Sequence, residues 1–226
     1  ADGTVVVGTG TSASGPEAWI GRVGFISGLI TLSDLNNSLA SVGGLMNGGR
    51  YVISLPFYGA HHRPLLSYHG LTSGRCVWAS GDLADYGHQE DGEAGLAEVG
   101  GCYDLIPQRL RLGVGVGKSY LDQDLSFAGE SDLDGEYIIA EVDYALEGLP
   151  LLASLTGMYG EWDADVTRGY LNAGVLDASF GDTDITAWAV RGRLDWVNAF
   201  QYSDIHFTPR VAYTVSRVDV DGYTES

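Results

Sequence analysis

The feature that most constrains the fold is an alternation of apolar and polar residues that recurs from about residue 75 to the end of the chain. It is clearest over 109–120, where Leu and Val occupy the even positions 110 to 116 and Arg, Gly and Ser the odd ones. Successive side chains of a strand point to opposite faces, so a period of two indicates β-strands. Seven runs predict an all-β, antiparallel protein, and they are Arg75–Leu83, Leu96–Leu105, Arg109–Tyr120, Tyr137–Tyr144, Leu152–Gly160, Ala187–Trp196 and Arg210–Ser216.

Alternation alone leaves open which face meets solvent. A soluble sandwich buries its apolar faces, whereas a membrane barrel turns them to lipid and its polar faces to the lumen. The connections between runs favour a barrel, because short and long ones alternate, as periplasmic turns and outside loops do in outer-membrane proteins. The short ones are Ile106–Gln108, Glu147–Pro150 and Val197–Ser203, and the longer ones, rich in Asp and Gly, are Gly87–Gly95, Leu121–Leu133 and Glu161–Asp184.

The charge balance excludes several functions. The 226 residues contain 12 Lys and Arg against 30 Asp and Glu, a formal net charge of −18. Phosphate backbones and anionic membrane surfaces are bound by clustered basic residues, so nucleic-acid binding and adhesion to an anionic leaflet are not expected. A solvated acidic surface is the plain alternative explanation. No apolar run approaches the roughly 18 residues of a membrane-spanning helix. No charged and apolar signal segment follows Ala1, so a signal peptide is expected to be absent or to lie upstream of this sequence.

The two cysteines give an internal check on the strand register. If Arg75–Leu83 and Leu96–Leu105 form a hairpin centred on Gln89, Cys76 lies directly opposite Cys102 and both face the same side. Directly opposite residues of an antiparallel pair are within disulfide reach. A disulfide is therefore predicted, with two buried free thiols as the alternative.

A helix is predicted from Thr31 to Met46, before the strand runs. Ser33 suits the N-cap position, and Gly43–Gly44 and Gly48–Gly49 weaken or end the helix. Periodicity leaves open whether it sits in a hydrated lumen or on the surface of a sheet. Upstream, Thr4–Val7 and Trp19–Ile30 resemble strands. The residues at helical spacing are Leu32, Leu35, Leu39, Val42 and Met46.

The basic triplet His61–His62–Arg63 lacks further metal ligands nearby in sequence, so it is interpreted as a linker loop. No metal site and no cofactor are predicted. The chain also lacks a Ser-His-Asp order, a phosphate-binding loop and a nucleotide fingerprint.

Several stretches of the chain, taken in order, resemble a known protein family. The succession "AHHRPLLSY", "CVWASGDLADYG", "LAEVGGCYDL", "LRLGVGVGKSYLDQDL", "DGEYIIAEVDYAL" and "ASLTGMYGEWDADVTRGYLNAG" resembles the C-terminal translocator of type V secretion autotransporters, over about Leu32 to Ser226. The resemblance implies a transmembrane β-barrel of about twelve strands crossed by a pore helix and preceded by a secreted passenger. Since seven runs are present and no aromatic-ended terminal strand follows Ser226, the chain is expected to be truncated.

The resemblance divides the chain into the end of the passenger or linker strands (1–30), the pore helix and its connection (31–67), and the N-terminal part of the barrel (68–226). It also implies a set of pore-lining charges that hold the helix: Asp82, Glu98, Arg109, Arg111, Glu141, Asp143, Arg191 and Arg193. Some members cleave themselves between two asparagines with help from lumen carboxylates. Asn36 and Asn37 are the candidate residues for such a step, with no other catalytic residue expected.

The sequence therefore predicts an outer-membrane translocator that anchors and exports its passenger to the cell surface and is not itself an enzyme. The expected partners are outer-membrane lipid, the barrel-assembly machinery, periplasmic chaperones and the passenger. Two alternatives stay open: a soluble secreted β-rich adhesion module, and a self-cleaving barrel that releases its passenger at Asn36–Asn37.

Overall fold

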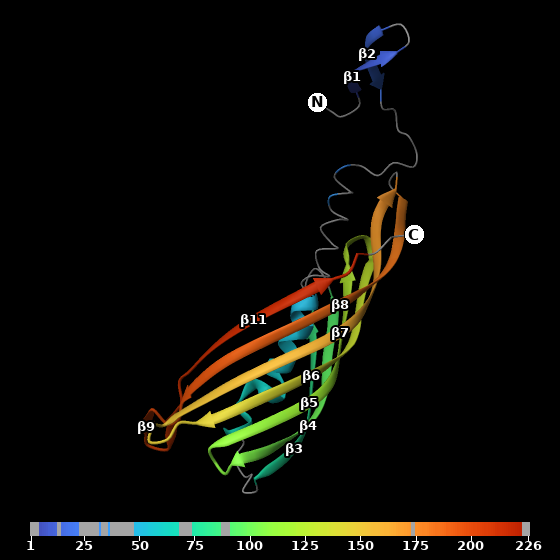
Figure 1. Ribbon diagram of the computed structural model, residues 1–226. Coiled ribbons are helices and arrows are strands. Elements are labelled where there is room, and N and C mark those ends of the chain that lie inside the picture. Colours follow the sequence, from blue (N-terminus) through green and yellow to red (C-terminus); the bar gives the residue numbers. More distant parts are fainter. Residues whose placement is uncertain are drawn as a thin grey trace.

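The computed structural model describes residues 5–12, 15–22, 32, 36, 48–67, 74–86, 91–172 and 175–222 of the chain. Its centre is a curved antiparallel sheet of seven strands in the order β11-β8-β7-β6-β5-β4-β3, with β3 and β11 at its two edges (Figure 1). The strands are β3 (Arg75–Tyr86), β4 (Gly92–Ile106), β5 (Leu110–Leu125), β6 (Gly129–Ala145), β7 (Leu151–Asn172), β8 (Val175–Trp196) and β11 (Arg210–Val220). Separately, β1 (Val5–Ser12) pairs with β2 (Gly15–Arg22).

The seven predicted strands are confirmed, but two features of the connections differ. The regions 121–133 and 161–184 were expected to be long loops. Instead the strands extend into them from both sides: β5 and β6 leave only the 3-10 turn η3 (Ser126–Ala128) between them, and β7 and β8 reach 22 residues each (Figure 1). The alternation persists there with Asp on one face, which was mistaken for loop composition. The connection after Val197, expected to be short, holds a small hairpin of β9 (Phe200–Tyr202) and β10 (Ile205–Phe207).

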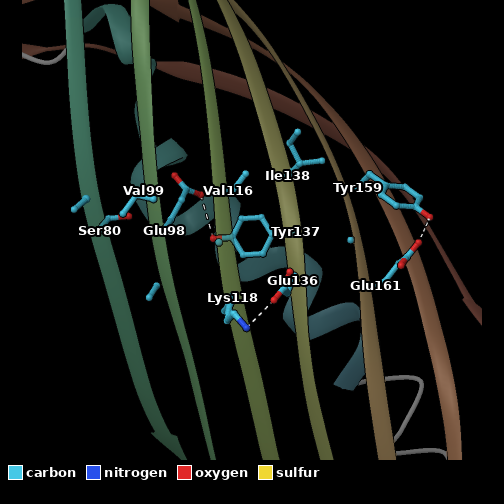
Figure 2. A pocket seen from close by; sticks show the side chains of 14 residues that line it. Ser80, Glu98, Val99, Val116, Lys118, Glu136, Tyr137, Ile138, Tyr159 and Glu161 are labelled. Carbon is cyan, nitrogen blue, oxygen red and sulfur yellow. Dashed lines mark hydrogen bonds and ion pairs between the residues drawn. The ribbon is translucent and has the colours of Figure 1, made fainter.

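The outer face of the sheet is divided by polarity along one row of paired residues. Below the row, which here means toward the turns at 107–109 and 146–150, exposed apolar side chains form a belt. Within it, Val114 is 45% exposed and Ile138 is 49% exposed. The row itself aligns Lys118, Glu136, Glu161 and Thr186 on neighbouring strands. Figure 2 shows this boundary, with Val116, Ile138 and the Tyr159 ring on one side and the Lys118–Glu136 pair (2.6 Å) on the other.

Above the row, the outer face carries two cross-strand ladders of carboxylates. One joins Asp134, Asp163 and Asp184, and the other joins Asp122, Asp132, Asp165 and Asp182, each residue directly opposite the next. Like charges placed directly opposite each other are destabilising in a sheet. This face must therefore be solvated, and we name it the acidic belt.

The concave face is also divided, in the opposite sense. Beside the acidic belt it is apolar: Leu121, Leu133, Trp162, Val166 and Ile185 are buried against the helix at 48–58. Beside the outer apolar belt it is polar, and Glu98, Arg111, Glu141 and Asp143 are all at most 3% exposed. The lumen was expected to be polar throughout, so the apolar half is a correction. Each half of the wall thus has one apolar face and one polar face.

Helical structure is present beyond the predicted end of the helix at Met46. Leu32 and Asn36 are helical, and so are residues 48–58, which include the Gly48–Gly49 pair that was expected to weaken or end the helix. The rest of the predicted helix Thr31–Met46, with Gly43–Gly44, lies outside the described residues. Close packing explains the glycines: a Cβ on Gly48 would lie 2.8 Å from Leu121 Cδ2, and one on Gly49 would lie 3.0 Å from Val218 Cγ1. They bring the helix onto the sheet, as Figure 1 shows for its position within the curve. In the described part of the chain, no helix combines the length and apolar character needed to cross a membrane.

Candidate functional site

The candidate site is formed where the chain leaves the helix. Residues 59–67 fold into two short 3-10 turns, η1 (Ala60–His62) and η2 (Leu65–Ser67), on the polar half of the concave face. Helix and turns together, residues 48–67, are called the inner segment below. Leu65 is 1% exposed and packs on Gly113, where a Cβ would lie 2.1 Å from Leu65 Cδ1. The glycine of β5 therefore provides the recess that receives the inner segment.

His61 is the centre of the site. Its ring is fully buried and lies between two carboxylates of the wall, with Nδ1 2.7 Å from Glu141 Oε2 and Nε2 3.1 Å from Glu98 Oε1. Burial alone would lower the pKa of His61, but the hydrogen bonds to Glu141 and Glu98 and their negative charges outweigh it and raise that pKa to about 9. The ring is therefore an imidazolium at neutral pH, and it joins β4 to β6 through the inner segment.

The two carboxylates are themselves saturated with hydrogen bonds. Glu98 accepts from Trp78 Nε1 (2.7 Å) and from the Tyr137 hydroxyl (3.1 Å), a contact visible in Figure 2. Glu141 accepts from the Leu65 backbone N–H (2.9 Å) and from Thr156 Oγ1 (3.1 Å). Buried charges are tolerated when they are paired and hydrogen-bonded in this way.

Arginines of the wall hold the backbone of the inner segment. Arg191 donates to the carbonyls of Phe57 (2.9 Å) and His61, and Arg111 donates to the carbonyl of Leu65 (3.0 Å) while it pairs with Asp104. Phe57 belongs to the last turn of the helix, whose carbonyls have no partner within the helix and carry partial negative charge. The arginines thus satisfy groups that would otherwise be buried without hydrogen bonds.

Six of the eight predicted pore-lining residues come together on the concave face: Glu98, Arg111, Glu141, Asp143, Arg191 and Arg193. Asp82 lies on edge strand β3 and is exposed. Arg109 does not join them, since it stacks on Tyr144 of the outer face (5.5 Å) and pairs with Glu147 (2.8 Å). Alternation fails there because Arg109 follows a tight turn in which Gln108 has a φ of 57°.

Sequence reasoning missed His61, which it placed in a linker loop. The charges predicted to hold the helix contact its last turn at Phe57 and the residues that follow it, up to Leu66. A signal was present in the excess of inward carboxylates over inward arginines. The five carboxylates are those of Glu98, Asp104, Glu141, Asp143 and Asp195, and the three arginines are Arg111, Arg191 and Arg193. An unmatched buried carboxylate needs a cation, and the nearest unassigned candidates were the two histidines.

Two further predictions concern single residues. The cysteine register is as predicted, for Cys76 pairs with Cys102 and the two form a disulfide with a Cα–Cα distance of 4.9 Å. Asn36 is helical and exposed, and Asn37 lies outside the described residues. Four lumen carboxylates were expected to be available for cleavage: Asp82, Glu98, Glu141 and Asp143. Of these, Glu141 and Asp143 accept hydrogen bonds from the backbone N–H groups of Leu65 and Leu66. Self-cleavage stays a prediction.

The arrangement suits fixation rather than catalysis. Both ring nitrogens of His61 are occupied, the ring has no exposed surface, and its neighbours are fully hydrogen-bonded. A catalytic base must reach a substrate proton, directly or through one water. The site therefore attaches the inner segment to the concave face of an open seven-stranded sheet, which defines the class of protein as a partial β-barrel with a segment fixed on its inner face.

Comparison with known proteins identifies the family. The family model described as autotransporter beta-domain matches residues 77–226, and this chain belongs to that family. An uncharacterized protein from the trpE-trpG intergenic region of Pseudomonas putida is 34% identical over 164 residues, 66% of this chain and 25% of that protein. Esterase EstA of Pseudomonas aeruginosa and that of Pseudomonas putida are each 33% identical over 159 residues, 66% of this chain and 24% of theirs.

The chain thus spans about a quarter of the length of these relatives. The beta-domain of an autotransporter is a translocator and not a catalytic domain.

Proposed function

We propose that this chain is the outer-membrane anchor and export channel for a passenger that precedes it, with the inner segment fixed in the lumen as a plug. The observation that carries the proposal is the polarity of the sheet: apolar side chains are exposed outside, while Glu98, Arg111 and Glu141 are buried inside. A soluble protein has the reverse arrangement, and a barrel in lipid has this one. Family membership supports the same reading.

The row Lys118–Glu136–Glu161–Thr186 is proposed as the outer boundary of the hydrocarbon. The exposed apolar belt below it would contact acyl chains, and the acidic belt above it would stand in water on the cell-surface side. The short turns Ile106–Leu110 and Leu146–Leu151 lie at the opposite, periplasmic end, as in other outer-membrane barrels. Barrel-assembly machinery and periplasmic chaperones are the partners that such a protein requires.

Passenger export can be tested in intact cells with the full-length protein. An epitope placed in the passenger should be cut by added protease in cells that carry the natural beta-domain. Arg in place of Val114 and Val142, on the lipid-facing side, should abolish surface exposure, because each Arg at the bilayer centre costs about 2–4 kcal/mol. Asp163→Asn, on the acidic belt, is the matched control and should change nothing.

The outcomes separate the competing functions. Normal surface exposure of the Val114→Arg/Val142→Arg variant would contradict the proposal and favour a soluble adhesion module. If the natural protein releases its passenger into the medium and the Asn36→Ala variant does not, self-cleavage is added to the translocator function. Release that continues in Asn36→Ala would remove Asn36 as the attacking residue.

A further inference from the structure

The β9–β10 hairpin differs from the other connections at the short-turn end of the sheet. Neighbouring strands are joined there by residues 107–109 and 146–150, whereas residues 197–209, between β8 and β11, contain a hairpin of their own. Figure 1 shows this hairpin at the end of the two strands. It adds a surface that the other two turns do not have.

The two faces of the hairpin differ in polarity. Side chains alternate along a strand, so residues that are two positions apart share a face. One face, here called the aromatic face, holds four apolar side chains that are 58–83% exposed, paired as Phe200 with Phe207 and Tyr202 with Ile205. The opposite face holds the remaining pair, Gln201 and His206. The hairpin is therefore amphipathic, and its aromatic face carries no charge.

The polar face of the hairpin is turned toward the lumen. His206 lines a cavity together with Arg193 and Asp195. The side chains of Arg193 and Asp195 belong to the concave face of the sheet and are each 7% exposed. The aromatic face must then be turned toward the outside, as the apolar side chains of the wall are.

The aromatic face continues the outer apolar belt of the wall. Trp196 is the last outward residue of β8, after Val190 and Leu194, and it is 46% exposed. The Phe200 ring lies 5.9 Å from the Trp196 ring and 6.2 Å from the Phe207 ring. The exposed apolar surface therefore runs without a break from the belt onto the hairpin.

The length of β8 places the hairpin along the membrane normal. Thr186 belongs to the row proposed above as the outer boundary of the hydrocarbon, and Trp196 follows it by ten residues on the same strand. At about 3.3 Å per residue and a strand tilt of about 40°, this is about 25 Å along the normal, the height of the apolar band of an outer-membrane barrel. Trp196 then lies at the periplasmic boundary of the hydrocarbon, and the hairpin lies at the level of the headgroups.

We propose that the aromatic face of the β9–β10 hairpin binds the surface of the periplasmic leaflet, with its rings between the headgroups and the first acyl segments of the lipids. The inference rests on the proposed function, which sets the orientation of the sheet in the membrane. Aromatic side chains favour this interface, and an amphipathic segment lies in it with its apolar face inward. The hairpin thereby fixes the depth of the short-turn end, while its polar face borders the periplasmic mouth of the lumen.

Fluorescent labels on the two faces test the proposal with the full-length protein in vesicles of phosphatidylcholine brominated at defined depths. Bimane is attached to Tyr202→Cys or Ile205→Cys on the aromatic face, and to Gln201→Cys or His206→Cys on the other face. All four positions are exposed, so the labels fit without displacing the fold, and the two natural cysteines are joined in the disulfide.

The labels at 202 and 205 should be quenched by shallow bromines and lie about 5–10 Å into the interface, the depth usual for such a face. The labels at 201 and 206 should be quenched by aqueous iodide instead. Phe207→Asp, which places a charge on the aromatic face, should move the label at 202 out of reach of the bromines. Gln201→Asp, on the opposite face, is its matched control and should leave that label in place.

Equal quenching of the two faces, whether by iodide or by bromines, would overturn the proposal. So would a label at 202 that iodide reaches in pure lipid vesicles but not in native outer membranes, because another protein would then cover the aromatic face.

A bimane label on Val114→Cys separates this inference from the proposed function. If bromines quench that label while the label at 202 meets water, only the hairpin lies off the membrane and only this inference is wrong. If the label at Val114 also meets water, the outer face of the sheet does not contact lipid and the proposed function itself is wrong.

Discussion

Replacing His61 by Ala tests the buried charge network that holds the inner segment. The change removes an imidazolium at 2.7 and 3.1 Å from two carboxylates that are each at most 1% exposed. Breaking a buried ion pair costs about 3–5 kcal/mol when a charge is left without its partner. Glu98 retains Trp78 and Tyr137, and Glu141 retains Leu65 and Thr156, which favours the lower end. The expected loss is therefore about 3 kcal/mol.

The loss should appear as release of the inner segment from the wall. Val52 has no exposed surface, so a Val52→Cys variant reacts with a maleimide only when the segment opens. The two natural cysteines are joined in the disulfide and give no background. At about 1.4 kcal/mol per factor of ten, His61→Ala should speed labelling about 100-fold. His206→Ala, which removes an exposed histidine, should leave the rate unchanged.

His61→Gln provides an intermediate case, because an amide can bond to one carboxylate but carries no charge. A labelling rate in His61→Ala within about threefold of the parent, in a variant that still folds, would refute the assignment of His61 as a charged link. The inner segment would then be held by the apolar contacts of its helix.

Three further outcomes follow from the same geometry. The stability that His61 provides should be complete below pH about 6.5 and lost as the pH rises through about 9, because the pKa of His61 is raised in the folded state. The measurement is the difference in unfolding free energy between the parent and His61→Gln in urea, which should disappear above pH about 9. Gly113→Ala should cost about 1–3 kcal/mol by displacing Leu65, whereas Gly157→Ala, which meets no atom within 4 Å, should change the urea midpoint little; equal effects would contradict the recess. Asp132→Asn should raise the free energy of unfolding in urea by up to about 1 kcal/mol, because it removes the repulsion of Asp132 by Asp122 and Asp165. The gain should be smaller in about 1 M salt, which screens these charges. A loss of stability would show that the acidic belt is not under repulsion.

The fold was predictable where the alternation had one apolar and one polar face. Leu112, Val114 and Val116 show it without ambiguity, and both the strand and its outward apolar face were assigned correctly. Beyond Lys118 the same period continues with Asp122 and Asp124 outward, and such residues also favour loops. Strand and loop have the same composition there, so the extensions of β5 to β8 could not be recognised.

The polar site was only half predictable. The wall charges Glu141 and Arg191 follow from strand parity, which is local information. His61 follows no such periodicity, because its position depends on how the helix ends and on the recess at Gly113. Those are tertiary contacts between residues about 50 positions apart, and no local pattern encodes them.

The most direct test of the account uses spin labels on the outer face of the full-length protein in lipid vesicles. Labels at Val114 and Ile138, within the apolar belt, should collide with dissolved oxygen more than with a water-soluble nickel chelate. A label at Asp163, above the Lys118–Glu136 row, should show the opposite preference. Ready access of the nickel chelate to the label at Val114 would contradict the claim that this face of the sheet lies against lipid.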